Sequence, residues 1–234
     1  MRTLPTPRLV RLLFNGEFIV QTTDASFVWE HPYYPQYYFP KSALLDSQAK
    51  DFKAEQGAEI RDSKGNVVAH RYTLTVREHS TEDCIVFSSD LSGPGEVVKG
   101  LVKVDFKAID RWFEESMPIA VHPKDPYKRV DVLPSRRHVQ VYIDKCKVAD
   151  TTSSMHLYET GLPCRFYLPL TDVDVRALRP SKTKTQCPYK GEAEYYSVDT
   201  GSGQVATDVV WFYERPTLEC AKIEGEFIFM LACH

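Results

Sequence analysis

The sequence predicts a mainly β protein with a few short helices, arranged as two tandem domains related by an internal repeat. Residues 10–40 and 139–169 align without a gap at a constant offset of 129, and both segments end in Tyr-x-Pro, beginning at Tyr38 and Tyr167. Residues 98–102 also resemble residues 223–227. Self-similarity of this kind indicates two copies of one structural unit.

Short-range patterns predict that most elements of each copy are strands. Asn15-Gly16 between two apolar runs predicts a tight hairpin, because a type I′ turn needs two residues at positive φ. Apolar and polar residues alternate elsewhere with a period of two, which is typical of strands with one buried face. These strand segments are 72–76, 139–143, 209–213 and 223–231.

Helical signals are few. Apolar residues between 106 and 113 recur at helical spacing behind Asp105, which would cap the helix. A short helical turn is expected at 173–178, with Asp172 as its cap. The glycines at 93–95 and 201–203 predict hairpin turns, since neither pair lies between a parallel strand and a helix N-terminus, where it could bind phosphate.

The expected domains are residues 1–117 and 138–234, joined by a connector at 118–137. Four prolines in this connector disfavour helix and central strand, so we expect it to be stiff and extended. It also carries five basic and two acidic residues. We interpret these charges as a solvated surface in preference to an anion site.

Composition and charge exclude several classes of protein. The formal net charge is −3 and Lys and Arg are not concentrated, so nucleic acid is not an expected partner. No apolar run approaches the ~18–20 residues of a membrane-spanning helix, so we expect a soluble protein and no membrane partner. The N-terminus lacks the apolar region of a signal peptide and the cysteines form no Cys-x-x-Cys pair, which together favour a cytoplasmic protein with reduced thiols.

Neither a metal nor an organic cofactor is expected. The six cysteines and seven histidines are scattered, and the paired spacing of a zinc site is not present. The pattern of residues does not indicate an oligomeric state.

Three clusters of aromatic and ionisable residues are candidate functional segments, at 29–40, at its counterpart 158–169 and at 187–196. Prolines and tyrosines this dense cannot all lie in regular sheet, so part of the first cluster should present aromatic faces that suit a small-molecule pocket. Equally, the rings could plug the ends of two small β units.

Glu30 and Glu159 occupy equivalent positions in the two copies, each after an aromatic residue at a strand end. Apolar rings around a carboxylate would favour proton uptake and hence acid–base chemistry. Their presence in both copies instead favours a structural role. Lys190 and Cys187 occur in one copy only, which makes them better functional candidates, although Cys187 also fits a buried thiol.

The segments 29–38, 122–131, 187–191 and 195–198 together resemble the tandem, fungal-type form of domain-of-unknown-function family 427, over residues 8–231. The resemblance implies an Mss4-like or β-tent fold for each domain, without the metal site of the Mss4 proteins. It implies no activity. The nucleotidyltransferase label attached to the family gains no support from Asp172 and Asp174, because Gly201-Ser202 follows these carboxylates and does not precede them. The apolar ending at 227–234 departs from the short polar tail common in the family.

We expect the site at the seam between the two domains, since ligand clefts lie preferentially at domain interfaces. Lys190 and Arg165 would anchor a carbonyl or carboxylate, and Glu30 or His31 would transfer protons. The predicted catalytic residues are Glu30, His31, Lys190 and Tyr196. The predicted ligand-binding residues are Trp29, Tyr34, Tyr37, Tyr158, Arg165, Tyr189, Tyr195 and Trp211.

Two functions from different classes fit these residues. The first is a cofactor-free isomerase or cyclase, of the kind found in secondary metabolism, that acts on an apolar small molecule by orienting and polarising it. The second is a non-catalytic small-molecule binding or carrier protein. An ordered ligand in an aromatic cavity fits both functions, and turnover separates them.

Overall fold

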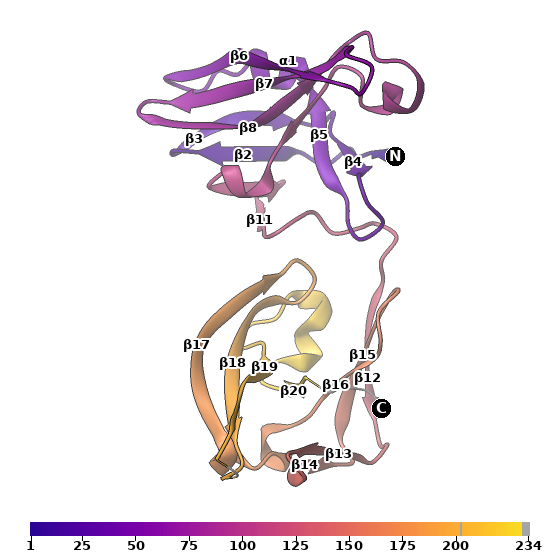
Figure 1. Ribbon diagram of the computed structural model, residues 1–234. Helices are drawn as coiled ribbons and strands as arrows, with labels where there is room; N and C mark the ends of the chain where they lie inside the picture. Colours follow the sequence, from indigo (N-terminus) through magenta and orange to yellow (C-terminus); the bar gives the residue numbers. More distant parts are fainter. Residues whose placement is uncertain (202, 231–234) are drawn as a thin grey trace. The chain divides into compact units, whose positions relative to one another are not determined.

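The computed structural model of the chain describes residues 1–201 and 203–230 and is built mostly of β-strands (Figure 1). Contacts divide the chain into two compact units, Met1–Asp125 and Pro126–His234. The mainly β, tandem two-domain class predicted from the sequence is confirmed.

The first unit contains two antiparallel sheets, and in Figure 1 β6, β7 and β8 form one layer while β2 and β3 belong to the other. The strands of the larger sheet, in spatial order, are β1 (Arg2–Pro5), β4 (Ser26–Trp29), β5 (Gln36–Pro40), β9 (Leu101–Val104), β8 (His79–Phe87), β7 (Val67–Val76) and β6 (Phe52–Arg61). Those of the smaller sheet are β11 (Met117–Ile119), β10 (Arg111–Glu114), β2 (Val10–Phe14) and β3 (Glu17–Thr22). The helical segments are α1 (Lys41–Leu45), η1 (Gly93–Val98) and η2 (Phe106–Ala108).

One apolar core joins both sheets of the first unit. Leu12 and Ile19 from the smaller sheet are fully buried in the same cluster as Leu74 and Val102 from the larger one. Burying a side chain of this size stabilises the fold by about 1.5–3 kcal/mol. The period-two alternation of the strands places these residues on one face and therefore determines which faces meet.

The second unit repeats this arrangement with a smaller second sheet. Its main strands, in spatial order, are β12 (Val130–Ser135), β15 (Ser154–Glu159) and β16 (Arg165–Tyr167), followed by β20 (Phe227–Phe229), β19 (Val205–Phe212), β18 (Gly191–Asp199) and β17 (Leu178–Cys187). A single bridge, between Leu168 and Phe227, joins the two groups. The hairpin of β13 (Val139–Ile143) and β14 (Cys146–Thr151) lies apart from them, and the helical segments are η3 (Leu170–Asp172), η4 (Val175–Ala177) and η5 (Leu218–Ile223). In Figure 1, β17, β18 and β19 curve around the yellow helical segment η5.

The repeat extends further than the sequence indicated. Arg2 pairs with Trp29 in the first unit, and Asp131 pairs with Tyr158 in the second, which is the same register shifted by 129. The strand β12, which lies inside the expected connector 118–137, is therefore the first strand of the second unit. Strands β10 and β11 have no counterpart among the described residues of the second unit.

The first hairpin matches its prediction, whereas the helix expected between 106 and 113 is wrong. Asn15 and Gly16 have φ of 44° and 80°, and β2 pairs with β3 across them. Only residues 106–108 are helical, with the Asp105 side chain accepting a hydrogen bond from the Lys107 backbone N–H. Trp112 lies in strand β10, where its burial decides its conformation.

Three further local expectations need correction. Asp174, not Asp172, caps the helical turn η4, by accepting a hydrogen bond from the Arg176 backbone N–H. Residues 93–98 form a 3-10 helix where a hairpin turn was expected. The strand expected at 223–231 is restricted to Phe227–Phe229, after η5, and position 231 lies outside the described residues.

Candidate functional site

A buried ion pair in the second unit joins Lys190, in the turn between β17 and β18, to Glu159 at the end of β15. The Nζ atom of Lys190 lies 2.6 Å from Oε2 of Glu159, and the two side chains are only 11% and 8% exposed. Such a pair is retained at a desolvation cost of several kcal/mol per ion, which its hydrogen bond and Coulomb attraction must offset. A charged pair in this environment is a candidate for chemistry.

The turn that carries Lys190 is held by the segment before η5. The Lys190 carbonyl accepts a hydrogen bond from the Thr217 backbone N–H at 3.0 Å, and the Tyr189 carbonyl accepts one from the Thr217 hydroxyl. Gly191 follows with φ of 105°, and a Cβ there would lie 3.1 Å from the Arg215 carbonyl oxygen. Only glycine fits both conditions, so this backbone fixes where the lysine side chain begins.

The hydroxyl of Tyr167 is buried in the same unit and has no hydrogen-bond partner. Burial raises the pKa of Tyr167, so the phenol keeps its proton and can act only as a neutral donor or acceptor. Leaving such a group unpaired costs about 1–3 kcal/mol. Its ring centroid lies 6.4 Å from that of Tyr213, and burial, with smaller contributions from charges that include Glu159, raises the pKa of Tyr213 as well.

The Tyr167 side chain lies in an apolar core. Tyr167, Tyr213 and Cys220 belong to one buried core with Leu157 and Ile223. Burial raises the pKa of the Cys220 thiol, although the Lys190 charge opposes this shift, so the thiol stays protonated. The second unit thus contains a buried cation–carboxylate pair and, in its apolar core, one unpartnered hydroxyl.

Several residues predicted from the sequence lie at the margin of this core. Tyr195 and Trp211 pack against it as partly buried side chains, with ring centroids 6.1 Å apart. The Arg165 guanidinium carbon lies 5.9 Å from the Trp211 ring centroid. Tyr189 is buried, while Tyr158 is 43% exposed.

Tyr196 lies away from this group. Neighbouring residues of a strand point to opposite faces, and the Tyr196 ring packs 5.7 Å from each of the Phe212 and Phe227 rings in a different core cluster. The structure therefore does not bring Tyr196 to the Lys190 amine, as the sequence analysis expected.

In the first unit, Glu30 takes part in a more exposed version of the same arrangement. Its carboxylate accepts hydrogen bonds from the Tyr38 hydroxyl at 3.1 Å and from the Lys103 ammonium at 2.7 Å. The Lys103 and Glu30 side chains are 26% and 28% exposed. Burial, followed by the charge of Glu30 and the hydrogen bond to it, raises the pKa of Tyr38.

Three more predicted residues of the first unit contact the chain before the second unit or one another. The His31 and Tyr34 rings meet edge to face at 4.3 Å, and Tyr34 stacks on His122 at 4.1 Å. The Trp29 indole N–H donates to Asp125 at 2.9 Å. His122 and Asp125, both more than nine-tenths buried, were assigned to a solvated connector from the sequence, because charge alone does not reveal burial.

Tyr37 is a core residue. It is 1% exposed, its ring stacks on Phe27 at 5.0 Å, and its hydroxyl donates to Glu114 at 2.9 Å. Its burial leaves it no free surface for the ligand-binding role predicted from the sequence. The location of a site at the seam between the units stays a prediction.

Sequence reasoning did not select Tyr167, whose hydroxyl is the unpartnered group of the candidate site. Its identity with Tyr38 across the repeat was the available signal. Within residues 1–201 and 203–230, no three His, Cys, Asp or Glu side chains are grouped so as to hold a metal ion. Over the same described ranges, no helix has the length and apolar character needed to span a membrane.

The fold and these paired sites define a tandem β protein in which each unit carries its own Glu–Lys pair. Residues 2–115 and 131–232 match the family called Domain of unknown function (DUF427). Because the two matches together cover most of the sequence, the chain belongs to this family and carries its domain twice. A comparison with curated proteins gave no match.

Proposed function

We propose that the chain is a cofactor-free enzyme of the isomerase or cyclase type, which moves a proton within an apolar small molecule that bears a carbonyl group. The observation that carries this proposal is the buried Lys190–Glu159 pair in the same unit as the unpartnered Tyr167 hydroxyl. Each group has a role in this chemistry that needs no metal or nucleotide.

Glu159 is the proposed base. Its carboxylate would take a proton from the carbon next to the carbonyl, so that a C–H bond breaks and an enolate forms. The same carboxylic acid would then return the proton to a different carbon, which completes an isomerisation without net gain or loss of atoms. A positioned base of this type contributes about 10²–10⁴-fold to a rate.

Lys190 and Tyr167 would stabilise the enolate oxygen. An ammonium has three N–H donors, and Lys190 gives one of them to Glu159. Tyr167 keeps its proton because burial raises its pKa, so its hydroxyl is a donor at neutral pH. Donors that face developing charge in apolar surroundings are usually the largest electrostatic contribution to catalysis.

The second candidate is a non-catalytic binding or carrier protein. A carboxylate that already accepts a hydrogen bond from an ammonium at 2.6 Å is a weak base until the pair separates. The same cation and hydroxyl could hold a carbonyl ligand without proton transfer, and this geometry favours the carrier over other non-catalytic roles.

Proton transfer in D₂O tests the proposal without knowledge of the natural substrate. The probes are 4-phenylbutan-2-one, followed by NMR for hydrogen–deuterium exchange, and 3-cyclohexenone, followed by absorbance for conversion to the conjugated isomer. We expect Glu159→Gln to lower the catalysed rate by about 10²–10⁴-fold and Tyr167→Phe by about 10²-fold. Circular dichroism verifies that each variant is folded.

Matched controls come from the first unit. Tyr38→Phe and Lys103→Met remove the corresponding groups there and should leave the rate unchanged. Binding of the ketones without exchange by the unmodified protein would support the carrier. A rate that survives Glu159→Gln would contradict the assigned base.

A further inference from the structure

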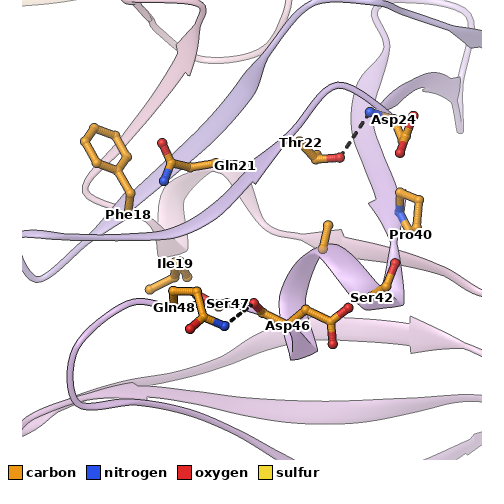
Figure 2. A pocket seen from close by; sticks show the side chains of 11 residues that line it. Phe18, Ile19, Gln21, Thr22, Asp24, Pro40, Ser42, Asp46, Ser47 and Gln48 are labelled. Carbon is orange, nitrogen blue, oxygen red and sulfur yellow. Dashed lines mark hydrogen bonds between the residues drawn. The ribbon is translucent and has the colours of Figure 1, made fainter.

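The first unit has a surface depression of about 310 Å³ between β3 and α1 (Figure 2). Its two carboxylates, those of Asp24 and Asp46, are exposed. None of the buried polar atoms that lack a hydrogen-bond partner within residues 1–201 and 203–230 belongs to its lining. The depression therefore does not indicate a ligand. The surface that indicates a partner is the free edge of the larger sheet.

Strand β6 forms this edge and pairs with β7 alone among the described strands (Figure 1). The register of the two strands is continuous from Phe52 to Gln56, before a bulge interrupts it. Just before this stretch, the Asp51 carbonyl accepts a hydrogen bond from the Arg77 backbone N–H. Hydrogen-bonded positions alternate along an antiparallel pair, so the odd-numbered residues of the stretch bond to β7 and the even-numbered ones direct their backbone N–H and C=O groups outward. The stretch is therefore able to pair with a further strand.

Two charges without partners lie on the exposed face of this stretch. Lys53 and Glu55 are both exposed, and within the described part of the chain neither side chain forms an ion pair or a hydrogen bond. The residues opposite them on β7 are Thr75 and Thr73, which supply no charge. Ala54, between them, points to the other face and packs against the core. One positive and one negative charge thus lie on either side of a small residue.

We propose that β6 pairs antiparallel with β6 of a second molecule of this chain, about a two-fold axis at Ala54. This register places Lys53 of each molecule opposite Glu55 of the other. Both pairs occupy non-hydrogen-bonded positions, where opposite side chains lie closer together and opposite charges stabilise the sheet. The small Ala54 side chains meet at the axis. Such a two-fold interface is self-complementary, and it does not depend on the chemistry proposed for the second unit.

The equivalent edge of the second unit is closed to this pairing. Strand β17 has ten residues, as β6 has, and it is the edge strand of its own sheet. Its third residue is Pro180, whereas the third residue of β6 is Ala54. Proline has no N–H to donate to a further strand, and its neighbours Arg179 and Ser181 do not form a pair of opposite charges. Proteins commonly block sheet edges in this way, so the open edge is particular to β6.

Sedimentation velocity of the full-length protein at increasing concentration tests the dimer. We expect a monomer–dimer equilibrium with a dissociation constant of about 10–500 µM, because five paired residues from each molecule bury less than the ~1,200 Å² of a stable complex. Ala54→Pro copies the proline of β17 and should abolish dimerisation. The Ala54 N–H points away from β7, so this change leaves the pairing of β6 with β7 intact, and circular dichroism verifies the fold.

Charge reversal tests the register separately. Lys53→Glu and Glu55→Lys each place like charges opposite one another at two positions of the dimer, and each should weaken dimerisation by about 10-fold. The double variant exchanges the two charges and should restore the affinity. Lys182→Glu is the matched control, because Lys182 is exposed on the edge strand of the second unit, and it should leave dimerisation unchanged.

Two results would overturn the dimer: a monomer at every concentration up to about 1 mM, or a dimer that persists in Ala54→Pro. Single charge variants that weaken dimerisation without recovery in the double variant would overturn the register about Ala54.

Discussion

The two units use the same repeated tyrosine and glutamate in different ways. In the first, Glu30 accepts hydrogen bonds from Tyr38 and Lys103 and stays about one-quarter exposed. In the second, Glu159 is buried with Lys190, and the equivalent tyrosine has no partner. The same backbone arrangement therefore carries two different hydrogen-bond networks. In the first unit the network is partly exposed and the tyrosine hydroxyl has a partner, whereas in the second unit it is buried and the tyrosine hydroxyl has none.

The source of the lysine explains this difference. Lys103 lies in β9, on a strand of the sheet, whereas Lys190 lies in the turn before β18. The Lys190 ammonium donates to Glu159 from this turn, and Glu159 accepts no hydrogen bond from the Tyr167 hydroxyl. Native proteins satisfy most buried polar groups, so the unpartnered Tyr167 hydroxyl marks a structural difference between the two copies.

The largest expected effect is the loss of Lys190. The change Lys190→Met leaves the Glu159 carboxylate buried without its cation and should lower the free energy of unfolding by about 3–5 kcal/mol. The equivalent change in the first unit, Lys103→Met, should cost no more than about 1 kcal/mol, because that pair is more exposed. Urea unfolding followed by circular dichroism measures both.

A double variant sharpens this comparison. Adding Glu159→Gln to Lys190→Met removes the unpaired charge and should recover most of the lost stability. Equal losses from the two single lysine variants would show that burial does not distinguish the pairs.

Replacing Tyr38 and Tyr167 by phenylalanine should change the stability of the protein in opposite directions. Tyr38→Phe removes a hydrogen bond to a charged group and should cost about 1.5–3 kcal/mol. Tyr167→Phe removes a buried hydroxyl with no partner and should be neutral or stabilising. Thermal unfolding of both variants measures this, and a loss from Tyr167→Phe equal to that from Tyr38→Phe would reveal a partner for its hydroxyl.

The repeat, the strand-rich class and the Asn15-Gly16 hairpin could be predicted because they depend on local spacing. Alternation also predicts that Tyr195 and Tyr196 face opposite ways, but it does not say which face meets Lys190. The expected helix after Asp105 failed because an apolar spacing can match a helix by coincidence while tertiary burial of Trp112 favours a strand.

The candidate site could be predicted only in part. The sequence identifies Lys190 as a functional candidate because it occurs in one copy only. Glu159 has a counterpart in the other copy, Glu30, and this repetition favours a structural role for it. What distinguishes Glu159 from Glu30 is its burial beside Lys190, a residue 31 positions further along the chain. No pattern within a short segment encodes that difference.

Alkaline pH should destabilise both units through their buried tyrosines. Burial raises the pKa of Tyr37 and Tyr38 in the first unit and of Tyr167 and Tyr213 in the second. The stability that these tyrosines contribute is fully present below the ordinary tyrosine pKa of 10.0. It falls as pH rises above that value, because the unfolded chain then loses protons that the folded chain retains. Each tyrosine should cost about 1.4 kcal/mol per pH unit above that value.

Urea unfolding between pH 9 and 11 measures the slope, and absorbance at 295 nm reports tyrosinate formation. Replacing both Tyr167 and Tyr213 by Phe should make the free energy of unfolding of the second unit depend less on pH. The pH dependence of the first unit should stay unchanged. Tyrosinate that forms in all four side chains before unfolding would contradict the burial argument.

The smallest expected effect concerns the two equivalent hairpin turns. Asn15 and Gly16 have φ of 44° and 80°, and the corresponding Asp144 and Lys145 have φ of 47° and 65°. A lysine at positive φ carries a steric cost of about 1–2 kcal/mol that glycine avoids, although glycine loses more chain entropy on folding. Lys145→Gly should therefore stabilise the second unit by about 0.5–1 kcal/mol, and Gly16→Lys should destabilise the first by a similar amount. A Cβ at Gly16 would meet no atom within 4 Å, so the second change isolates the backbone effect. If thermal unfolding shows both variants shifted in the same direction, backbone strain does not distinguish the two turns.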